Sequence, residues 1–453
     1  MAISGLGKSE FEEIMRHYVR PSDPIDSYEH LIGRAKQRES IEEAINSPGR
    51  HIFIYGDRGA GKTSLAQTIA HEHNPSASTP VFVACGAKTT FASIVEDLAA
   101  QLVGRSRFQV SERSTGFGGK LAAGCAEVNG SSASKVSERA IAALDLNAAT
   151  ALLSEATLTR GSRSVAVIDE FENLPSAEDR GLFAELIKQL SDRKVKITLV
   201  FCGIGASLED LLQGHGSAQR YLHEVQLPTP PLNIGERWEI IDAAAEKLGV
   251  TVNQDSRLRI AQVSDGFPHY VHLICEKLFW IAFRADEIVH EIEPADYMQA
   301  VANALGGVEA RLRQAYDKAV KKNVDQYEEI VWAIADHYEL ERNVQSIYQN
   351  SYLRIMEARG RAPVPQKTFT SRIAALKTER HGLMLSSSRH GWVKFSENLI
   401  RGYVRLVAEA NGVRVALEHE PAPAPKILTA GARRKGVDPA APTRNYGSWG
   451  KGM

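Results

Sequence analysis

The sequence GDRGAGKT, from Gly56 to Thr63, limits the fold of this chain more than any other feature. It follows the apolar stretch HIFIY, which is typical of a buried strand, and it precedes SLAQTIA, which is typical of a helix. Glycine permits the tight turns through which main-chain amides surround a phosphate group. A strand, a glycine-rich loop and a helix in this order therefore predict an α/β domain with a phosphate-binding loop.

The side chains of this loop predict ATP and Mg2+ as cofactors. The helix that we expect to begin at Lys62 directs the positive end of its dipole towards the anion. Lys62 can reach the β- and γ-phosphates, and the hydroxyl of Thr63 can bind Mg2+. The predicted nucleotide-binding residues are those of the loop and the residue after it: Gly56, Asp57, Arg58, Gly59, Ala60, Gly61, Lys62, Thr63 and Ser64.

A second motif, SVAVIDEFENLP, places acidic residues directly after another apolar stretch. Asp169, at the C-terminal end of this expected strand, can hold the Mg2+ ion. Glu170 beside it can orient and deprotonate an attacking water molecule, so it is the predicted catalytic base, with Lys62 as a second catalytic residue. In the alternative interpretation, Glu170 and Glu172 are solvated charges at the start of a loop. The two motifs lie far apart in the sequence, which leaves room for an intervening strand.

Length, charge and cysteine content limit the remaining possibilities. A chain of 453 residues suggests about two to four domains, and a net charge of −1 confines any nucleic-acid signal to part of the chain. The first residues lack the apolar core of a signal peptide, and no apolar run approaches the ~18 residues of a membrane span. The cysteines lie far apart, so neither a disulfide framework nor a zinc site is expected. We expect a cytoplasmic protein without membrane contact.

Between residues 28 and 230, short apolar strands alternate with helical stretches, which predicts a parallel sheet covered by helices on both faces. The strands are HIFIY, VFVAC, SVAVID, KITLVFC and HEVQL. Three helical stretches and a pair of short strands near the C-terminus have the order of a winged helix-turn-helix. We expect five further parts: an N-terminal extension at 1–27, a Gly/Ser-rich insertion at 107–137, a helical segment at 231–320, the winged helix at 325–412, and a disordered basic tail at 413–453.

The two motifs and their surroundings resemble those of the AAA+ ATPases, and among these the origin-recognition and replication-initiator ATPases and their bacterial relatives. LIGRAKQRESIEEAI looks like the GRE box of that clade, with Ala35 in place of the acidic residue. GIGASLEDLLQGHGSAQRYLHEVQLPTP looks like the stretch that ends in an arginine finger, the place that Arg220 occupies. DGFPHYVHLI looks like the second-sensor helix. The resemblance spans residues 28–410 and implies a three-layer P-loop sandwich with a helical lid at 231–320 and a C-terminal winged helix.

The resemblance also implies a homo-oligomer, because an arginine finger acts on the nucleotide of a neighbouring subunit. Arg220 would then be catalytic, although a lone arginine before a strand is often a surface ion-pair residue. Gly205 and Ala206, with Ser207 beside them, occupy the place of a polar first sensor. His269 replaces the second-sensor arginine, and it is either a weak phosphate contact or a half-buried packing residue. Hydrolysis is therefore expected to be slow or stimulated by a partner.

The expected winged helix contains a local excess of positive charge. Residues 361–405 carry nine Lys/Arg against two acidic residues. Phe369, Ile373 and Leu376 have the spacing of a core stripe on the third helix. The side chains expected to contact duplex DNA, mainly at phosphates, are Lys367, Thr370, Ser371 and Lys377 on this helix and Arg389 on the wing. A protein-docking module and a merely solvated basic face are the alternatives.

Three functions agree with these observations. The first is an ATP hydrolase whose ATP-dependent oligomers position a winged helix on duplex DNA, as an initiator or loader does. The second is a signalling NTPase switch, as in bacterial defence, that uses the winged helix to hold a partner protein. The third is a transposition-type helper ATPase that recruits another enzyme. Salt-dependent binding to arbitrary duplex DNA separates the first function from the second.

Overall fold

The computed structural model describes residues 3, 5–74, 80–104, 144–158, 163–213, 215–320 and 327–416. The expected Gly/Ser-rich insertion at 107–137 lies outside the described residues, and so does the expected basic tail from residue 417 onwards. Within the described residues, no helix combines the length and the apolar character that crossing a membrane requires.

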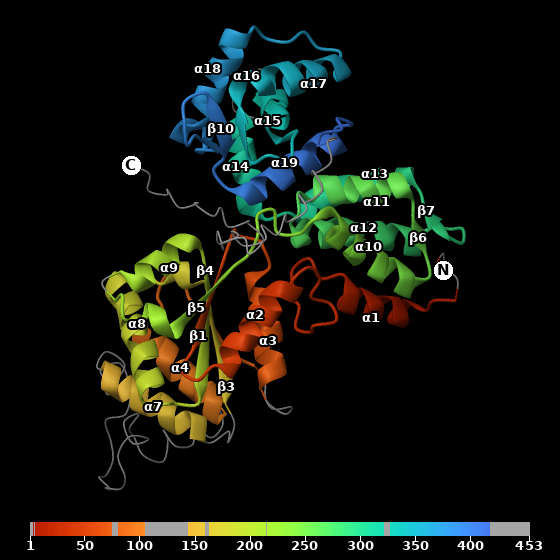
Figure 1. Ribbon diagram of the computed structural model, residues 1–453. Helices are drawn as coiled ribbons and strands as arrows, with labels where there is room; N and C mark the ends of the chain where they lie inside the picture. Colours follow the sequence, from red (N-terminus) through yellow and green to blue (C-terminus); the bar gives the residue numbers. More distant parts are fainter. Residues whose placement is uncertain are drawn as a thin grey trace, which may run out of the picture. The chain divides into compact units, whose positions relative to one another are not determined.

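Five parallel strands form a sheet in the order β2-β3-β4-β1-β5 (Figure 1). β4 separates β1 from β3, so the strand before the glycine-rich loop and the strand that ends at Asp169 are not neighbours. Each strand overlaps one of the apolar stretches identified in the sequence: β1 (His51–Tyr55), β2 (Val81–Ala84), β3 (Ser164–Asp169), β4 (Ile197–Gly203) and β5 (Leu222–Gln226). The predicted α/β fold with a parallel sheet is confirmed.

Helices cover both faces of this sheet (Figure 1). On one face, Phe53, Phe171, Phe183 and Phe201 form an aromatic cluster that packs against helices from the middle of the domain. These helices are α4 (Phe91–Val103), α7 (Leu146–Leu158), α8 (Ala177–Asp192) and α9 (Gly205–Leu212). The other face packs against α2 (Ala35–Asn46) and α3 (Lys62–His73). Burial on both faces explains why the strands read as continuous apolar runs.

A second, helical part follows the sheet domain. It contains α10 (Ile234–Leu248), α11 (Gln254–Val263), α12 (Pro268–Arg284) and α13 (Pro294–Ala304), with a short parallel pair of β6 (Thr251–Val252) and β7 (Glu291–Ile292). Asn233 caps α10 in a reciprocal pair of hydrogen bonds with Glu236, and Gly249 ends this helix with a φ of 69°.

The N-terminal residues add a helix to this part that the sequence analysis missed. α1 (Lys8–Tyr18) packs against α10 and buries Phe11 and Met15. The ring of Phe11 stacks on Phe283 at 4.2 Å between centroids and meets the edge of Trp280 at 4.8 Å. The expected extension therefore contributes to a hydrophobic core.

The C-terminal described residues form helices around a three-stranded antiparallel sheet in the order β8-β10-β9. The three core positions predicted for α18, Phe369, Ile373 and Leu376, are buried. The elements are α14 (Ala310–Val320), α15 (Tyr327–Ala335), β8 (Glu341–Asn343), α16 (Val344–Ser346), the π-helix η4 (Ile347–Tyr352), α17 (Leu353–Ala358), α18 (Gln366–Leu376), β9 (Leu385–Ser386), β10 (Trp392–Phe395) and α19 (Asn398–Ala410).

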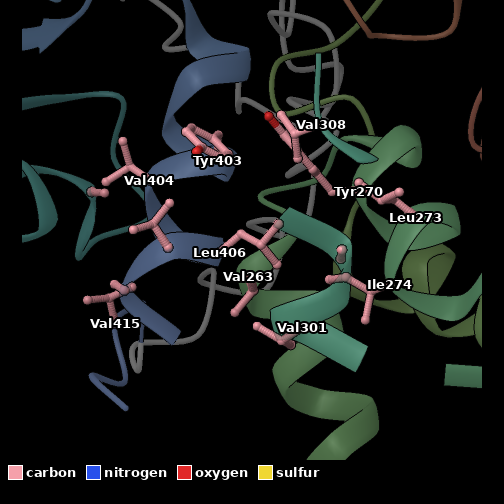
Figure 2. Close-up of a cluster of buried hydrophobic side chains, with 14 of the residues drawn as sticks. Val263, Tyr270, Leu273, Ile274, Val301, Val308, Tyr403, Val404, Leu406 and Val415 are labelled. Atoms are coloured by element: carbon pink, nitrogen blue, oxygen red, sulfur yellow. The ribbon is translucent and has the colours of Figure 1, made fainter. Parts of the chain in front are cut away.

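The last helix, α19, packs on the helices α11 to α13 through an apolar interface. Figure 2 shows Leu406 of α19 beside Val263 and Tyr403 beside Val308, and these side chains belong to one buried cluster with Ile274 and Val301. This interface makes α19 part of the same core as the helices that follow the sheet domain.

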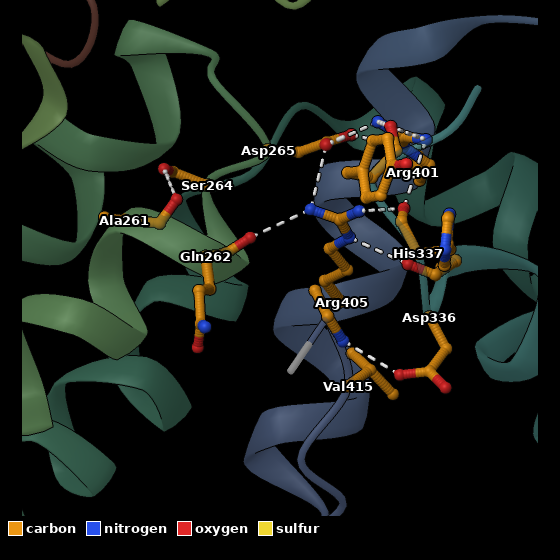
Figure 3. Close-up of polar contacts among 12 residues, drawn as sticks. Ala261, Gln262, Ser264, Asp265, Asp336, His337, Arg401, Arg405 and Val415 are labelled. Atoms are coloured by element: carbon orange, nitrogen blue, oxygen red, sulfur yellow. Dashed lines mark hydrogen bonds and ion pairs between the residues drawn. The ribbon is translucent and has the colours of Figure 1, made fainter. Parts of the chain in front are cut away.

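Buried ion pairs reinforce this interface (Figure 3). Asp265, after α11, accepts hydrogen bonds of 2.6 Å from both Nε and Nη2 of Arg401, and it lies 2.8 Å from Nη1 of Arg405. Only 3 % of Asp265, 1 % of Arg401 and 3 % of Arg405 is exposed. Two of the nine basic residues counted between 361 and 405 therefore do not reach the surface, and the basic face is smaller than the sequence suggests.

Candidate nucleotide-binding site

The glycine-rich loop lies between β1 and α3, as predicted. Gly59 and Gly61 have φ values of 77° and 90°, in the left-handed region that favours glycine. Lys62 begins α3, and its Nζ donates to the carbonyl oxygens of Gly56 at 3.1 Å and Asp57 at 2.9 Å. The ammonium group thus lies over the loop, where a phosphate chain held by the loop amides would meet it.

Thr63 and Asp169 meet although 106 positions separate them in the sequence. The hydroxyl of Thr63 donates to Oδ2 of Asp169 at 2.7 Å, and Asp169 is only 5 % exposed at the end of β3. A hydroxyl and a carboxylate are oxygen ligands that suit Mg2+. The two side chains thus fit the ion that the sequence predicts, directly beside Lys62.

Glu170 has an unusual backbone conformation for a residue other than glycine. Its φ is 53°, and its amide donates to Oδ1 of Asp169 at 2.9 Å. The side-chain amide of Asn173 donates to Oε2 of Glu170 at 3.1 Å. Positive φ values at such residues often occur where a side chain is held in position for function. Here the conformation places an oriented, exposed carboxylate next to Asp169.

A cavity of about 390 Å³ lies over these residues. Its volume falls in the usual range of small-molecule sites. The predicted residues Arg58, Gly59, Gly61, Lys62, Thr63, Ser64, Asp169, Glu170 and His269 line it, together with Arg20, Pro21, Ser22, Asp23, Pro24, Ile25, Glu172, Pro268, His272, Glu309 and Leu399. Gly56, Asp57 and Ala60 belong to the loop but not to the cavity wall.

Arg34 is a buried part of the site that the sequence analysis missed. Its Nη2 donates to the carbonyl of Ala60 at 2.7 Å, and its Nη1 donates to that of Pro231 at 2.8 Å. Arg34 is 2 % exposed, and burial lowers the pKa of its guanidinium to about 10. It ties the loop to the segment before α10. The resemblance to the GRE box singled out the neighbouring Ala35, and no local sequence signal indicated that Arg34 is buried at the loop.

Residues 20–25 form a wall of the cavity that no motif had indicated. The hydroxyl of Ser64 accepts a hydrogen bond of 3.1 Å from the amide of Ile25, and Thr68 donates to the carbonyl of Ile25 at 3.0 Å. His269 forms a hydrogen bond of 2.7 Å between its Nδ1 and the carbonyl of Pro21. The carbonyl can only accept, so Nδ1 carries the proton.

The start of α19 contacts the phosphate loop. Asp57 Oδ2 accepts from the side-chain amide of Asn398 at 3.0 Å and from the hydroxyl of Thr229 at 2.8 Å. Leu399 packs on Gly59 so closely that a Cβ atom there would lie 3.0 Å from its Cδ1. The helix that Asp265 joins to α11 and α12 thus also contacts the glycine-rich loop.

Two residues expected near the nucleotide do not line the cavity. Arg220 is exposed in the turn η2 (Gln219–Tyr221), with its guanidinium 4.7 Å from the centre of the Tyr221 ring. Ser207 is 2 % exposed, and its hydroxyl donates to the carbonyl of Ile204 at 2.6 Å. The role of Arg220 across a subunit interface remains a prediction, and Ser207 is occupied within its own helix turn.

The candidate DNA-contacting residues are mostly on the surface. Lys367, Thr370 and Ser371 are exposed on α18, and Arg389 is exposed between β9 and β10. Arg389 stacks over Trp392, with 3.6 Å between its Cζ and the ring centre. Lys377 is half-buried and donates a hydrogen bond to Ser387.

Comparison with known proteins agrees with this geometry. Residues 45–212, which contain both motifs, match a family model described as AAA domain. No curated protein matches the chain. A Walker-type ATPase of Pyrococcus abyssi is similar in structure, with a TM-score of 0.50 and 14% identity over 85% of this chain and 99% of that one.

Two further archaeal structures resemble the chain more weakly. Cdc6p of Pyrobaculum aerophilum has a TM-score of 0.44 and 15% identity over 89% of this chain and 99% of its own. The ORC2 protein of Aeropyrum pernix has a TM-score of 0.46 and 13% identity over 87% and 98%. The matched region, the parallel sheet and the two motifs at its edge agree with one another: residues 45–212 are similar to an AAA domain.

Proposed function

We propose that this protein binds ATP with Mg2+ in the cavity over the phosphate loop and hydrolyses it. The observation that carries the proposal is the hydrogen bond of 2.7 Å between Thr63 and Asp169, beside Lys62. These side chains come from the two distant motifs and supply the cation, hydroxyl and carboxylate that a Mg2+–nucleotide requires.

Each side chain has a separate task in this proposal. Lys62 exchanges its carbonyl partners on the loop for the β- and γ-phosphates, and the loop amides hold the β-phosphate. Thr63 and Asp169 hold Mg2+, which neutralises charge on the phosphates. Glu170 orients the attacking water and accepts its proton. Arg34 holds the main chain of the loop at Ala60 in the geometry that the amides need.

Two substitutions separate binding from hydrolysis. Lys62→Ala should abolish ATP binding, because it removes the cation that compensates the phosphate charge. Glu170→Gln should keep ATP binding and reduce turnover by about a hundredfold or more, because an amide cannot accept the proton of water. Calorimetric titration and phosphate release measure the two effects. Hydrolysis by Glu170→Gln at the wild-type rate would show that Glu170 is not the base.

We further propose that the C-terminal segment is a winged helix that binds duplex DNA. The order helix, strand, helix, helix and paired strands from α15 to β10 supports this assignment. Lys367, Thr370 and Ser371 are available on the third of these helices. Exposed Arg220 would complete the ATP site of a neighbouring copy, so that the active form is a homo-oligomer.

A signalling switch is the second candidate, and the contact of α19 with the loop favours it. Asn398 and Leu399 touch Asp57 and Gly59, so the C-terminal segment contacts the nucleotide loop without any need for DNA. In this function the exposed basic residues would face an acidic partner protein. The helper-ATPase function shares the chemistry of the first candidate.

Salt-dependent DNA binding distinguishes these candidates. Binding through phosphates should weaken with log K falling by about 0.9 per neutralised phosphate for each decade of salt. Removal of Lys367, Lys377 and Arg389 together should reduce that slope by up to about three and leave ATP hydrolysis intact. Titration of labelled duplex with ATP and with ADP measures both. Failure to bind duplex at low salt in either state would exclude the DNA function and leave the switch.

A further inference from the structure

His272 is a buried polar side chain with no hydrogen-bond partner among the described residues. It lies on α12, only 5 % of it is exposed, and neither Nδ1 nor Nε2 has a partner. Buried polar groups in folded proteins are almost always hydrogen-bonded, so an unpaired imidazole needs an explanation. The proposed catalytic residues do not supply one, because none of them bonds to His272.

The position of His272 points to a ligand. It lines the cavity over the phosphate loop, and it lies three residues after His269, on the same face of α12. His269 uses Nδ1 to bond Pro21, while its Nε2 is buried without a partner in the part of the chain that the structure describes. Two imidazoles on one helix face thus present unpaired nitrogens at the wall of one cavity.

The surroundings of His272 differ from those of the phosphate-binding groups. The ionisable groups that act on its imidazole are His269 and Arg20. Arg20 belongs to the wall segment 20–25, which is fixed to α3 through Ile25 and the side chains of Ser64 and Thr68. His272 and the wall segment thus line the same cavity as the phosphate loop, from elements other than that loop.

The charge state of His272 restricts the chemistry of its partner. Burial lowers the pKa of this imidazole to about 4, and His269 and Arg20 act in the same direction. The ring is therefore neutral near pH 7, with one N–H donor and one acceptor nitrogen. Ribose hydroxyls and the edge of a purine base offer both donors and acceptors. A phosphate offers acceptors only, and the loop already supplies its donors.

We propose that His272 binds the nucleoside part of the nucleotide, through a hydrogen bond to the base or to a ribose hydroxyl. The proposal rests on the ATP binding proposed above. It makes His272 a binding residue that distinguishes a nucleotide from inorganic polyphosphate, and it gives α12 a contact to the nucleoside in addition to the phosphate contact predicted for His269.

The test compares ATP and tripolyphosphate binding by calorimetry in the wild type, in His272→Leu and in a control. Loss of one neutral hydrogen bond should weaken ATP binding by about threefold to tenfold. Tripolyphosphate binding should not change, because it lacks a nucleoside. Lys277→Ala, on the same helix but outside this cavity, should bind both ligands as the wild type does. The nucleotide-free His272→Leu protein should melt at the same temperature as the wild type or higher, because a buried unpaired polar group has been removed.

Two analogues identify the group that His272 contacts. 2′-Deoxy-ATP lacks a ribose hydroxyl, and purine riboside triphosphate lacks the 6-amino group of adenine. If one analogue binds equally well to the wild type and to His272→Leu, that analogue lacks the group that His272 contacts. If both analogues bind more weakly to His272→Leu than to the wild type, His272 contacts another atom of the nucleoside. If His272→Leu does not fold, His272→Met replaces it, and the same threefold to tenfold loss of ATP affinity is expected because the thioether cannot replace the hydrogen bond of the imidazole.

The outcomes separate this inference from the proposed function. If the wild type does not bind ATP, the proposed function itself is wrong. If the wild type binds ATP and the His272 variant binds it within twofold of the wild-type affinity, the inference is wrong. An equal loss of ATP and tripolyphosphate affinity would also overturn it, because the effect would then lie in the phosphate site or in the fold.

Discussion

His51 stabilises the strand before the phosphate loop through a buried hydrogen bond to the neighbouring strand. The amide of Leu199 in β4 donates to its Nδ1 at 3.0 Å, and His51 is 1 % exposed. Burial lowers the pKa of His51 to about 3, and Arg163 acts in the same direction. The imidazole is therefore neutral in the folded protein, while in the unfolded chain it titrates near 6.5. Stability from this group is complete above the unfolded pKa and is lost as pH falls towards the folded pKa.

We expect the free energy of unfolding to decrease between pH 7 and pH 5, because the unfolded chain binds more protons than the folded protein. His51→Gln should be less stable than the wild type at pH 7. Its free energy of unfolding should fall less steeply as the pH decreases, by up to about 1.4 kcal/mol per pH unit, because the variant lacks the proton that His51 binds in the unfolded chain. Urea unfolding at both pH values measures this, with exposed His290→Gln as the control. Identical pH slopes for His51→Gln and wild type would contradict this account of His51.

The residues of the two motifs could be predicted because their signal is local. Lys62 and Thr63 follow a glycine loop, and Asp169 ends an apolar run, so the sequence alone indicates their chemistry. Arg34 and Arg401 could not be placed in this way. Arg34 bonds to Pro231, 197 positions away, and Arg401 bonds to Asp265, 136 positions away. Nothing in the sequence near an arginine shows whether such a distant partner will bury it.

At the scale of elements, α19 is held to α11 and to the turn after it by ion pairs as well as by apolar packing. Asp265 forms ion pairs with both Arg401 and Arg405. A separate buried pair joins Arg259 of α11 to Glu409 of α19, with 3.0 Å between Nε and Oε1. A buried ion pair is costly to break because the remaining charge stays desolvated. Helices α11 and α19 should therefore move as one body.

Asp265→Asn should reduce stability by about 3–5 kcal/mol, because two buried guanidinium groups lose their counter-charge. Asparagine accepts the positive φ of 55° at this position, so the backbone need not change. Asp255→Asn is the matched control, because its pair with Arg414 is exposed and should contribute less than about 1 kcal/mol. Chemical unfolding of both variants measures the difference. Equal losses would show that the buried pair does not hold α19 in place.

Elements with a strong periodic pattern were predictable, and weakly patterned ones were not. The apolar runs predicted the five strands of the parallel sheet, and the spacing of Phe369, Ile373 and Leu376 predicted the buried face of α18. The helix α1 was not predicted, because only Phe11 and Met15 of its eleven residues are buried and the segment is largely charged. The strand β8 has the sequence ERN, and its pairing with β10 has no local apolar signal.

At the scale of the whole molecule, the cavity joins segments from both ends of the described chain. Residues 20–25 form one wall, the two motifs contribute Lys62, Thr63 and Asp169, and Leu399 of α19 belongs to another wall. Under the proposed function, this arrangement places the nucleotide beside the C-terminal segment. The proposed function depends throughout on the loop being a Mg2+–ATP site.

The Mg2+ dependence of ATP affinity tests that claim most directly. Calorimetric titration of the wild type should show tighter ATP binding with Mg2+ than with chelator. Thr63→Ala and Asp169→Asn, which remove the two proposed ligands, should bind ATP with nearly the same affinity in both conditions, while Ser207→Ala should behave as the wild type does. A wild-type affinity that does not respond to Mg2+, or variants that keep the full response, would contradict the assignment of Thr63 and Asp169 as the metal site.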